Sequence, residues 1–238
     1  MEEPFHLQED KTLLLLKGLE EANIVAGMTT RIGGMSETPY NTLNMGYHVS
    51  DNKEHVTRNY ELVESNLSIP KSRWVSAKQV HKSDVLIVDK PFLENIHQSP
   101  PNFDIQYDGF ITNEKNILLT AVYADCVPLF FYDTYGNWVG LAHAGWRGTV
   151  KGIGRKIITS LMEQGIPMEA IHAVIGPSIS QACYEVDRNV IDQIPLTYHT
   201  NAIMKQRDEN HFLLDLKQLN KNVLLETGLE EKQIKMEL

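Results

Sequence analysis

The sequence has little cysteine and no long apolar run, and both absences limit what the protein can be. Its 238 residues include two cysteines, Cys126 and Cys183, which are too few for the disulfide framework of a secreted scaffold. No stretch of eighteen apolar residues occurs, so no membrane span is expected. The beginning, MEEPFHLQED, is acidic and lacks the basic region of a secretory signal. We therefore expect a cytoplasmic protein with both thiols free for chemistry or for a metal.

Basic residues are also scarce relative to acidic ones. Lys and Arg total 22 and Asp and Glu total 31, so the formal net charge is −9. Nonspecific nucleic-acid binding depends on cationic patches, and a nucleic-acid partner is therefore not expected. A few local arginines could still hold a small anionic substrate. The hydrophobic share of 42% is enough for a full core.

The chain shows no repeat, no low-complexity segment and no long linker, which favours one domain. Strand-like segments are concentrated in its middle, over 22–31, 74–80, 84–89, 116–125, 127–133, 138–144 and 170–177. Helical periodicity covers 53–67, the stretch from Thr149 to Gly165, and the region around 216–224. This pattern predicts a single α+β domain with mixed β-sheets flanked by helices. The segment 90–106, which contains Pro100 and Pro101, is predicted to be a surface loop or a lid.

Three strand-like segments end or break at a residue that can bind a metal. They are KQVHKSD with His81, YADCVPL with Cys126, and LAHAGWRG with His143. Their separation excludes a local zinc-finger motif, so only tertiary folding could bring them together. Two imidazoles and one thiolate would hold zinc and leave a fourth position open, as in catalytic zinc sites. Taken singly, each is more often an ordinary core residue, and residue type alone leaves the question open.

Arg147 stands between Trp146 and Gly148 in GLAHAGWRGTVKG, directly before a predicted helix. Backbone N–H groups at a helix start, together with a guanidinium, suit a phosphate. An equally good interpretation is a turn whose arginine pairs with an acidic residue. The phosphate-loop patterns GxGxxG and GxxxxGK[ST] are both absent.

Four further polar residues are candidates for the site. Asp125 could orient a ligand histidine or lie in an ordinary bend. Glu185, in IGPSISQACYEV, could act as an acid or base or be a solvated turn carboxylate. Arg31 and Asn44 occur in the turn-rich segment TTRIGGMSETPYNTLNMGYHVSD and are candidate substrate contacts.

Taken together, the segments QVH, YADCVPL, AHAGWRGT and IGPSIS, with TTRIGGMS and YNTLNMG upstream, resemble the purine nucleoside phosphorylase family. That family was formerly called multicopper polyphenol oxidoreductase, or laccase-like. The resemblance runs from about residue 26 to about residue 186. It implies an α+β fold with mixed sheets flanked by helices. It also implies that His81, Cys126 and His143 bind zinc, with copper as a second possibility.

The resemblance also implies an activity. Adenosine, inosine and methylthioadenosine would react with phosphate to give free base and ribose 1-phosphate species, and adenosine deaminase activity would accompany this reaction. On this hypothesis Cys126, Asp125 and Arg147 are catalytic, and Arg147, Arg31, Asn44 and Glu185 bind nucleoside or phosphate. The protein would be a monomer or homodimer. Family members usually continue beyond KQIKMEL, so we expect 1–238 to form one domain without the usual C-terminal segment.

Three other functions use the same residues. Cys126 could be the nucleophile of a metal-independent hydrolase or transferase, with His81 or His143 as its base. Copper-dependent phenol oxidation is suggested by the older family label, but the His-x-His pairs common in such enzymes are absent. A zinc-stabilised interaction module would need a fourth ligand, for which Cys183 is the candidate.

Overall fold

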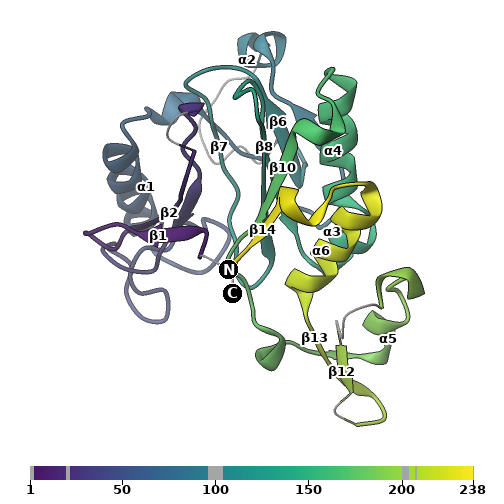
Figure 1. The fold of residues 1–238 in the computed structure, drawn as a ribbon. Helices are drawn as coiled ribbons and strands as arrows, with labels where there is room; N and C mark the ends of the chain where they lie inside the picture. Colours follow the sequence, from purple (N-terminus) through teal and green to yellow (C-terminus); the bar gives the residue numbers. More distant parts are fainter. Residues whose placement is uncertain (1–2, 20–21, 96–103, 200–203, 207, 238) are drawn as a thin grey trace.

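A six-stranded mixed sheet forms the centre of the molecule (Figure 1). The computed structural model describes residues 3–19, 22–95, 104–199, 204–206 and 208–237. In spatial order the strands are β14 (Ile234–Met236), β10 (Ile171–Ile175), β8 (Val127–Asp133), β9 (Val139–Ala144), β6 (Gly109–Thr112) and β5 (Val85–Ile87). The two outer pairs, β14 with β10 and β5 with β6, are parallel, whereas the inner pairs are antiparallel.

The central strands are apolar because both faces of the sheet are covered. Alternate side chains of a strand point to opposite faces. On β8, Leu129 and Phe131 pack among the core residues of the helices, while Phe130 packs with Phe5 and Leu16 on the other face. Such strands read as continuous hydrophobic runs, which explains why the sequence analysis located β8, β9 and β10 correctly.

Helices α3 (Trp146–Val150), α4 (Ile153–Glu163) and α6 (Leu216–Thr227) cover one face of this sheet (Figure 1). The helix expected from Thr149 begins three residues earlier, at Trp146. It is interrupted at Gly152, whose φ of 78° lies in the left-handed region that favours glycine. The second part, α4, is followed by Gly165 with a φ of 87°, as the periodicity predicts.

The opposite face is covered by a small antiparallel sheet. It consists of β1 (Phe5–Leu7), β2 (Leu13–Leu16) and β3 (Gly27–Thr29). Beside it, α1 (Lys53–Leu67) packs through Val56, Tyr60 and Val63 onto Trp74. Trp74 begins the short strand β4 (Trp74–Val75), which pairs in parallel with β7 (Leu118–Leu119).

The remaining elements lie at the periphery of the central sheet. They are α2 (Lys90–Asn95), β11 (Glu185–Asp187), α5 (Arg188–Ile191), β12 (Met204–Gln206) and β13 (His211–Leu214). Strands β11, β13 and β12 form a separate antiparallel sheet. The predicted loop or lid around Pro100 and Pro101 lies outside the described residues, and the first part of that segment is helix α2.

These mixed sheets and flanking helices confirm the predicted single α+β domain. The helix 53–67 is also confirmed as α1. The expected strand 22–31 is shorter, because only Gly27–Thr29 pairs, and 116–125 pairs only at Leu118–Leu119. Strands β1, β2, β6 and β11 to β14 were not predicted, since each is only three or four residues long and shows little periodicity.

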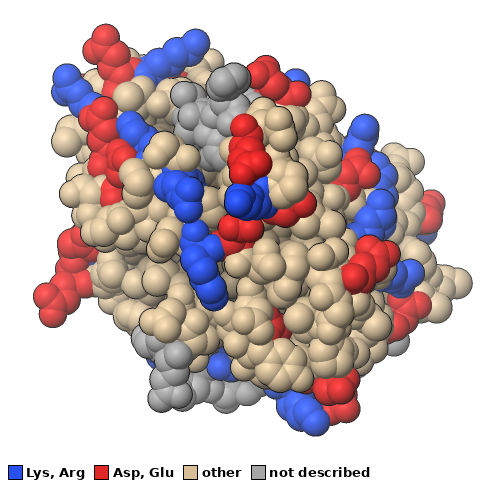
Figure 2. All heavy atoms as spheres, turned by 90° about the horizontal axis from the view of Figure 1, so that it is seen from above, with Lys and Arg blue, Asp and Glu red and all other residues tan. Residues whose placement is uncertain are grey.

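Two further features concern the apolar length of the helices and the charges on one face of the molecule. In the described part of the chain, no helix has both the length and the apolar composition that crossing a bilayer requires. On the face shown in Figure 2, Lys and Arg are interspersed with Asp and Glu. This mixture of charges is typical of a solvated surface.

Candidate metal centre

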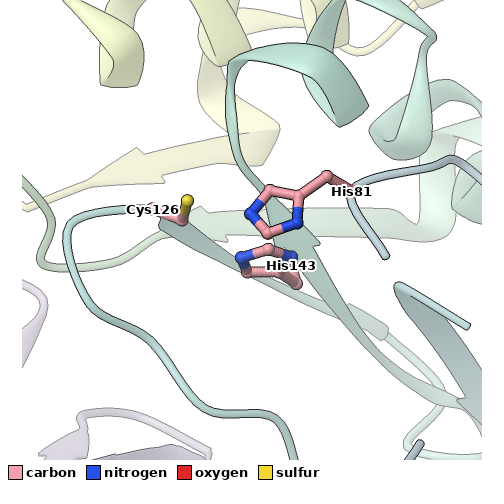
Figure 3. Close-up of side chains that lie close together, drawn as sticks. All are labelled: His81, Cys126 and His143. Carbon is pink, nitrogen blue, oxygen red and sulfur yellow. The ribbon is translucent and has the colours of Figure 1, made fainter. Parts of the chain in front are cut away.

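His81, Cys126 and His143 converge at one end of the central sheet. One ligand atom from each lies within 4.8 Å of the others, and Figure 3 shows the thiol and the two rings side by side. Cys126 directly precedes β8 and His143 lies on β9. These strands pair with Pro128 opposite His143 and Val127 opposite Ala144, which brings the thiol beside the histidine. His81 comes from the loop between β4 and β5.

The loop that carries His81 is held by the carboxylate of Asp108, the residue before β6. The backbone N–H groups of Val80, His81 and Lys82 all donate to it, at 3.1, 3.0 and 2.8 Å. Consecutive N–H groups that converge on one anion form a backbone nest. His81 has a φ of 57°, and this left-handed conformation, unusual for a residue other than glycine, is part of the nest.

The same carboxylate binds the second histidine. Nδ1 of His143 lies 2.9 Å from Oδ1 of Asp108, and the side chains are 4% and 0% exposed. Because Nδ1–H donates to the carboxylate, Nε2 is the nitrogen left to bind a metal. The hydrogen bond to Asp108 also fixes the orientation of the His143 ring. The His81 and His143 rings meet edge to face, with centroids 4.7 Å apart.

The histidines differ in their affinity for a proton. Burial lowers the pKa of His143, but hydrogen bonds to Asp108 and Cys126 raise it by more, to about 9. Burial lowers the pKa of His81, and the neighbouring His143 adds to that shift. Burial tends to raise the pKa of Asp108, but its hydrogen bonds, with that from His143 first, bring the pKa below its ordinary value. A metal ion would therefore displace a proton from His143.

These donors fit a three-coordinate protein site for a borderline metal. A tetrahedral zinc ion with ordinary Zn–N and Zn–S bonds has ligand atoms about 3.3–3.8 Å apart, so small side-chain rotations suffice here. Within the described ranges, the cluster contains these three residues and leaves out Cys183, which is exposed. The geometry therefore does not support a zinc-stabilised interaction module in which Cys183 is the fourth ligand.

A cavity of about 1140 Å³ opens beside this cluster. Its lining includes His81, Cys126 and His143, and also Arg31 and Asn44. Its apolar lining comes from the small sheet, from the segment between β2 and β3 and from the central strands, among them Leu15, Leu19, Ile24, Phe130 and Leu141. The volume is sufficient for a drug-sized ligand.

Asn59, on α1, organises the loop that brings Asn44 to the cavity. Its buried amide accepts the N–H of Met35 at 2.7 Å and donates to the Asn44 carbonyl at 2.8 Å. The Asn44 side chain donates to Asp51 at 2.8 Å. Arg31 is exposed and donates to the Asn41 carbonyl at 3.2 Å, so its guanidinium keeps further donors for a ligand.

Arg147, Asp125 and Glu185 lie outside the described lining of the cavity. Arg147 is exposed in the first turn of α3, with its guanidinium 4.4 Å from the ring centroid of Trp146. Asp125 is exposed next to Cys126 and has a φ of 77°. Glu185 is exposed on β11. The candidate residues thus fall into two groups, with Arg31 and Asn44 inside the cavity and these three outside it.

The sequence analysis missed residues that shape the centre. Asp108 was overlooked because Asp-Gly reads as a turn, although its place before the apolar FIT of β6 was a possible signal. Gln79 exchanges two 2.8 Å hydrogen bonds with the backbone of Val122, which ties the His81 segment to the Cys126 segment. The Tyr123 ring lies 5.6 Å from the His143 ring. Burial raises the pKa of the Tyr123 phenol, so it stays neutral.

The fold and the donor set define an α+β protein with a three-ligand candidate metal site beside a cavity. Comparison with known proteins agrees with this class. Residues 25–237 match the family model described as multi-copper polyphenol oxidoreductase laccase. The chain belongs to this family, as its motifs indicated.

Curated relatives and solved structures cover nearly the whole chain. The purine nucleoside phosphorylase YlmD of Bacillus subtilis is 39% identical over 97% of this chain and 85% of its own length. The protein of that name from Geobacillus stearothermophilus is 38% identical over 90% of this chain and 79% of its own. The crystal structure of the Geobacillus YlmD superposes with a TM-score of 0.89 at 34% identity, covering 99% of this chain and 88% of that one. Bacillus licheniformis hypothetical protein YfiH gives 0.87 at 33% identity, with coverages of 98% and 87%.

Replacing Gly145 with alanine is expected to weaken metal binding at least about tenfold. A methyl group there would lie 2.9 Å from Cys126 Sγ and 3.1 Å from His81 Cδ2, while the backbone at φ −67° accepts alanine. Titration with Co²⁺ and Zn²⁺ measures the effect. Gly140→Ala, whose methyl would crowd Ile111 and Ile157 at 3.3 Å on the helical face, is the control and should keep wild-type affinity. Equal affinity of Gly145→Ala and wild type would contradict the proposed site.

The metal-free protein is expected to lose stability as the pH rises from about 6.5 to about 9. The pKa of His143 rises from 6.5 to about 9 on folding, so its protonated form stabilises the folded state. That contribution is complete below pH 6.5 and disappears above about 9, with an upper magnitude of about 3 kcal/mol. Urea unfolding with a chelator present measures it, and His143→Gln should lack this component. The same pH dependence in both proteins would refute the assignment.

Proposed function

We propose that this protein is a zinc-dependent purine nucleoside phosphorylase. Adenosine, inosine and methylthioadenosine are its substrates, with phosphate as the second reactant, and adenosine deaminase activity belongs to the same proposal. The observation that carries it is the convergence of His81, Cys126 and His143 in the lining of a ligand-sized cavity. The names of the relatives support it, since several are called purine nucleoside phosphorylase.

Zinc is the metal that best fits the donor set. Two imidazoles and a thiolate suit zinc, and three protein ligands leave a position open, as in catalytic sites. His143 would bind through Nε2, because its Nδ1 donates to Asp108, and Cys126 would bind as the thiolate. When bound, the metal would supply a Lewis acid in the lining of the cavity. Copper also accepts these ligands and is the second choice.

The chain's own residues would bind and orient the reactants. Arg31 and Asn44 line the cavity and would contact the nucleoside. Arg147, exposed at the start of α3, would hold phosphate. In phosphorolysis the C1′–N bond to the purine breaks, a C1′–O bond to phosphate forms, and a proton goes to the departing base. A phosphate held beneath C1′ would stabilise the developing positive charge on the sugar. In the deamination, Asp125 or Glu185 would move the protons.

A metal-independent Cys-His hydrolase or transferase is the second candidate. One contact favours it: a hydrogen bond joins the Cys126 and His143 side chains and raises the pKa of His143. An imidazole beside a thiol is the arrangement of a cysteine nucleophile with its base. Copper-dependent phenol oxidation, which the family description suggests, is the third candidate, and a single described cluster of three ligands supports it less well.

A cytoplasmic location and a monomeric or homodimeric state complete the proposal. Cys126 and Cys183 are both free thiols, which suits a reducing compartment. On the face shown in Figure 2, mixed charges support a small-molecule substrate rather than a nucleic acid.

Purified protein is expected to convert inosine and phosphate to hypoxanthine and ribose 1-phosphate, with about one zinc ion per chain. Chromatography of the products and elemental analysis measure both. Omitting phosphate should stop hypoxanthine release, because phosphate is the attacking group. Release that ignores phosphate would refute phosphorolysis. Activity without metal that is lost on thiol alkylation would instead favour the cysteine hydrolase.

Arg147→Ala is expected to raise the KM for phosphate about tenfold to a hundredfold, since a charge-assisted hydrogen bond contributes about 1.5–3 kcal/mol. The KM for inosine should change much less. Lys151→Ala removes another exposed cation, at the end of the same helix, and is the matched control. An unchanged phosphate KM in Arg147→Ala would place phosphate elsewhere, with Arg31 in the cavity as the next cation to test.

A further inference from the structure

The side chain of Asp108 contacts both histidines of the candidate centre. Oδ1 accepts the His81 backbone N–H at 3.0 Å and lies 2.9 Å from His143 Nδ1. Oδ2 accepts the N–H groups of Val80 and Lys82 at 3.1 and 2.8 Å. The backbone carbonyl of Asp108 also accepts the His143 N–H at 2.7 Å. Four donors therefore surround one carboxylate that is 1% exposed.

We propose that Asp108 is the positioning residue of the metal centre. Its single carboxylate sets the tautomer of the His143 ring and the backbone conformation of His81. This inference rests on the proposed function only in requiring that the three ligands bind a metal. Asp108 touches neither reactant in this proposal and acts through the two histidines.

The first role follows from the chemistry of imidazole. A neutral ring carries one N–H, and the nitrogen without it binds the metal. A carboxylate can only accept hydrogen bonds, so it keeps the ring hydrogen of His143 on Nδ1. The lone pair on Nε2 then points toward Cys126. An asparagine amide at position 108 could turn its NH₂ group toward Nδ1, which would favour the tautomer that cannot bind through Nε2.

The second role follows from the backbone nest around the carboxylate. Three consecutive N–H groups point inward only while His81 keeps its left-handed conformation, with φ 57°, and they need an anion at their centre. Helix α3 closes the other side of this loop, since a Cβ on Gly148 would lie 2.9 Å from the Lys82 carbonyl oxygen. Without the carboxylate, these part-buried N–H groups lose their acceptor and the loop that presents His81 loses its anchor.

A merely structural carboxylate is available for comparison in the same sheet. Asp133 is also 1% exposed and also accepts three backbone N–H groups, from Tyr135, Asn137 and Trp138. It closes the turn between β8 and β9 at the end of β8 opposite to Cys126. Loss of a buried, hydrogen-bonded carboxylate is thus common to variants at both positions, whereas contact with the two histidines is particular to Asp108.

The test uses Co²⁺ as the probe in the full-length protein. Asp108→Asn is expected to weaken Co²⁺ binding about tenfold to a hundredfold, the usual loss when a carboxylate behind a metal-binding histidine is removed. It should also shift the visible absorption and the thiolate-to-cobalt charge-transfer band. Asp133→Asn should lower the urea midpoint and leave both the affinity and the spectrum unchanged.

Chemical rescue separates positioning from general stabilisation. Asp108→Ala removes a carboxylate that formate can replace, so added formate is expected to restore Co²⁺ affinity and spectrum, while equal chloride or formamide should not. Formate should have no effect on Asp133→Ala. Wild-type affinity and spectrum in Asp108→Asn, or no rescue of a folded Asp108→Ala, would overturn the inference and leave the proposed function standing.

A measurement on the unsubstituted protein tests the inference even if the variants fail to fold. Imidazole ¹⁵N chemical shifts of the Zn²⁺-loaded protein should show His143 with hydrogen on Nδ1 and metal on Nε2. Metal on Nδ1 would overturn the role of Asp108 even if the enzyme is active. Failure of the wild-type protein to bind Zn²⁺ or Co²⁺ would refute the zinc-dependent function and this inference together.

Discussion

The register between β8 and β9 governs where the ligand candidates lie. The two strands pair over their full length, with Pro128 opposite His143. Alternate residues of β9 face opposite sides: Ala142 and Ala144 belong to the helical core, while Leu141 and His143 line the cavity. A slip of one residue would turn His143 toward the helices. The large apolar side chains of β8, buried on both faces, oppose such a slip.

Around this framework, the site collects segments that are distant in the sequence but joined by hydrogen bonds. The Gln79 amide joins the His81 segment to the backbone of Val122, shortly before Cys126. Asp108 joins the same segment to β9 through His143. A buried carboxylate is costly unless its oxygens are satisfied, and here four N–H donors satisfy them. The polar cluster is therefore both a structural junction and a preorganised set of candidate ligands.

The cavity lies on the face of the sheet away from the helices. Arg31 and Asn44 reach it from a loop that Asn59 holds against α1. Helix α3 begins next to the centre, because a Cβ on Gly145, its N-cap residue, would lie 2.9 Å from Cys126 Sγ. The candidate metal site therefore stands where two covering layers meet at the end of the central strands. In sheet proteins generally, ligands bind where strand ends and loops from different layers converge.

The sequence determined the elements whose hydrophobic pattern is local and strong. The sequence was enough to locate strands β8, β9 and β10 and helix α1, because their apolar residues form strong local patterns. Residue type alone was enough to predict that His81, Cys126 and His143 could bind a metal. The family could be read from short motifs. Only the tertiary structure decided that these three side chains meet, that Asp108 contacts both histidines, and that Arg31 and Asn44 share the cavity while Arg147 does not line it. Such facts depend on strand register and on hydrogen bonds between residues far apart in the chain, which composition and periodicity do not encode.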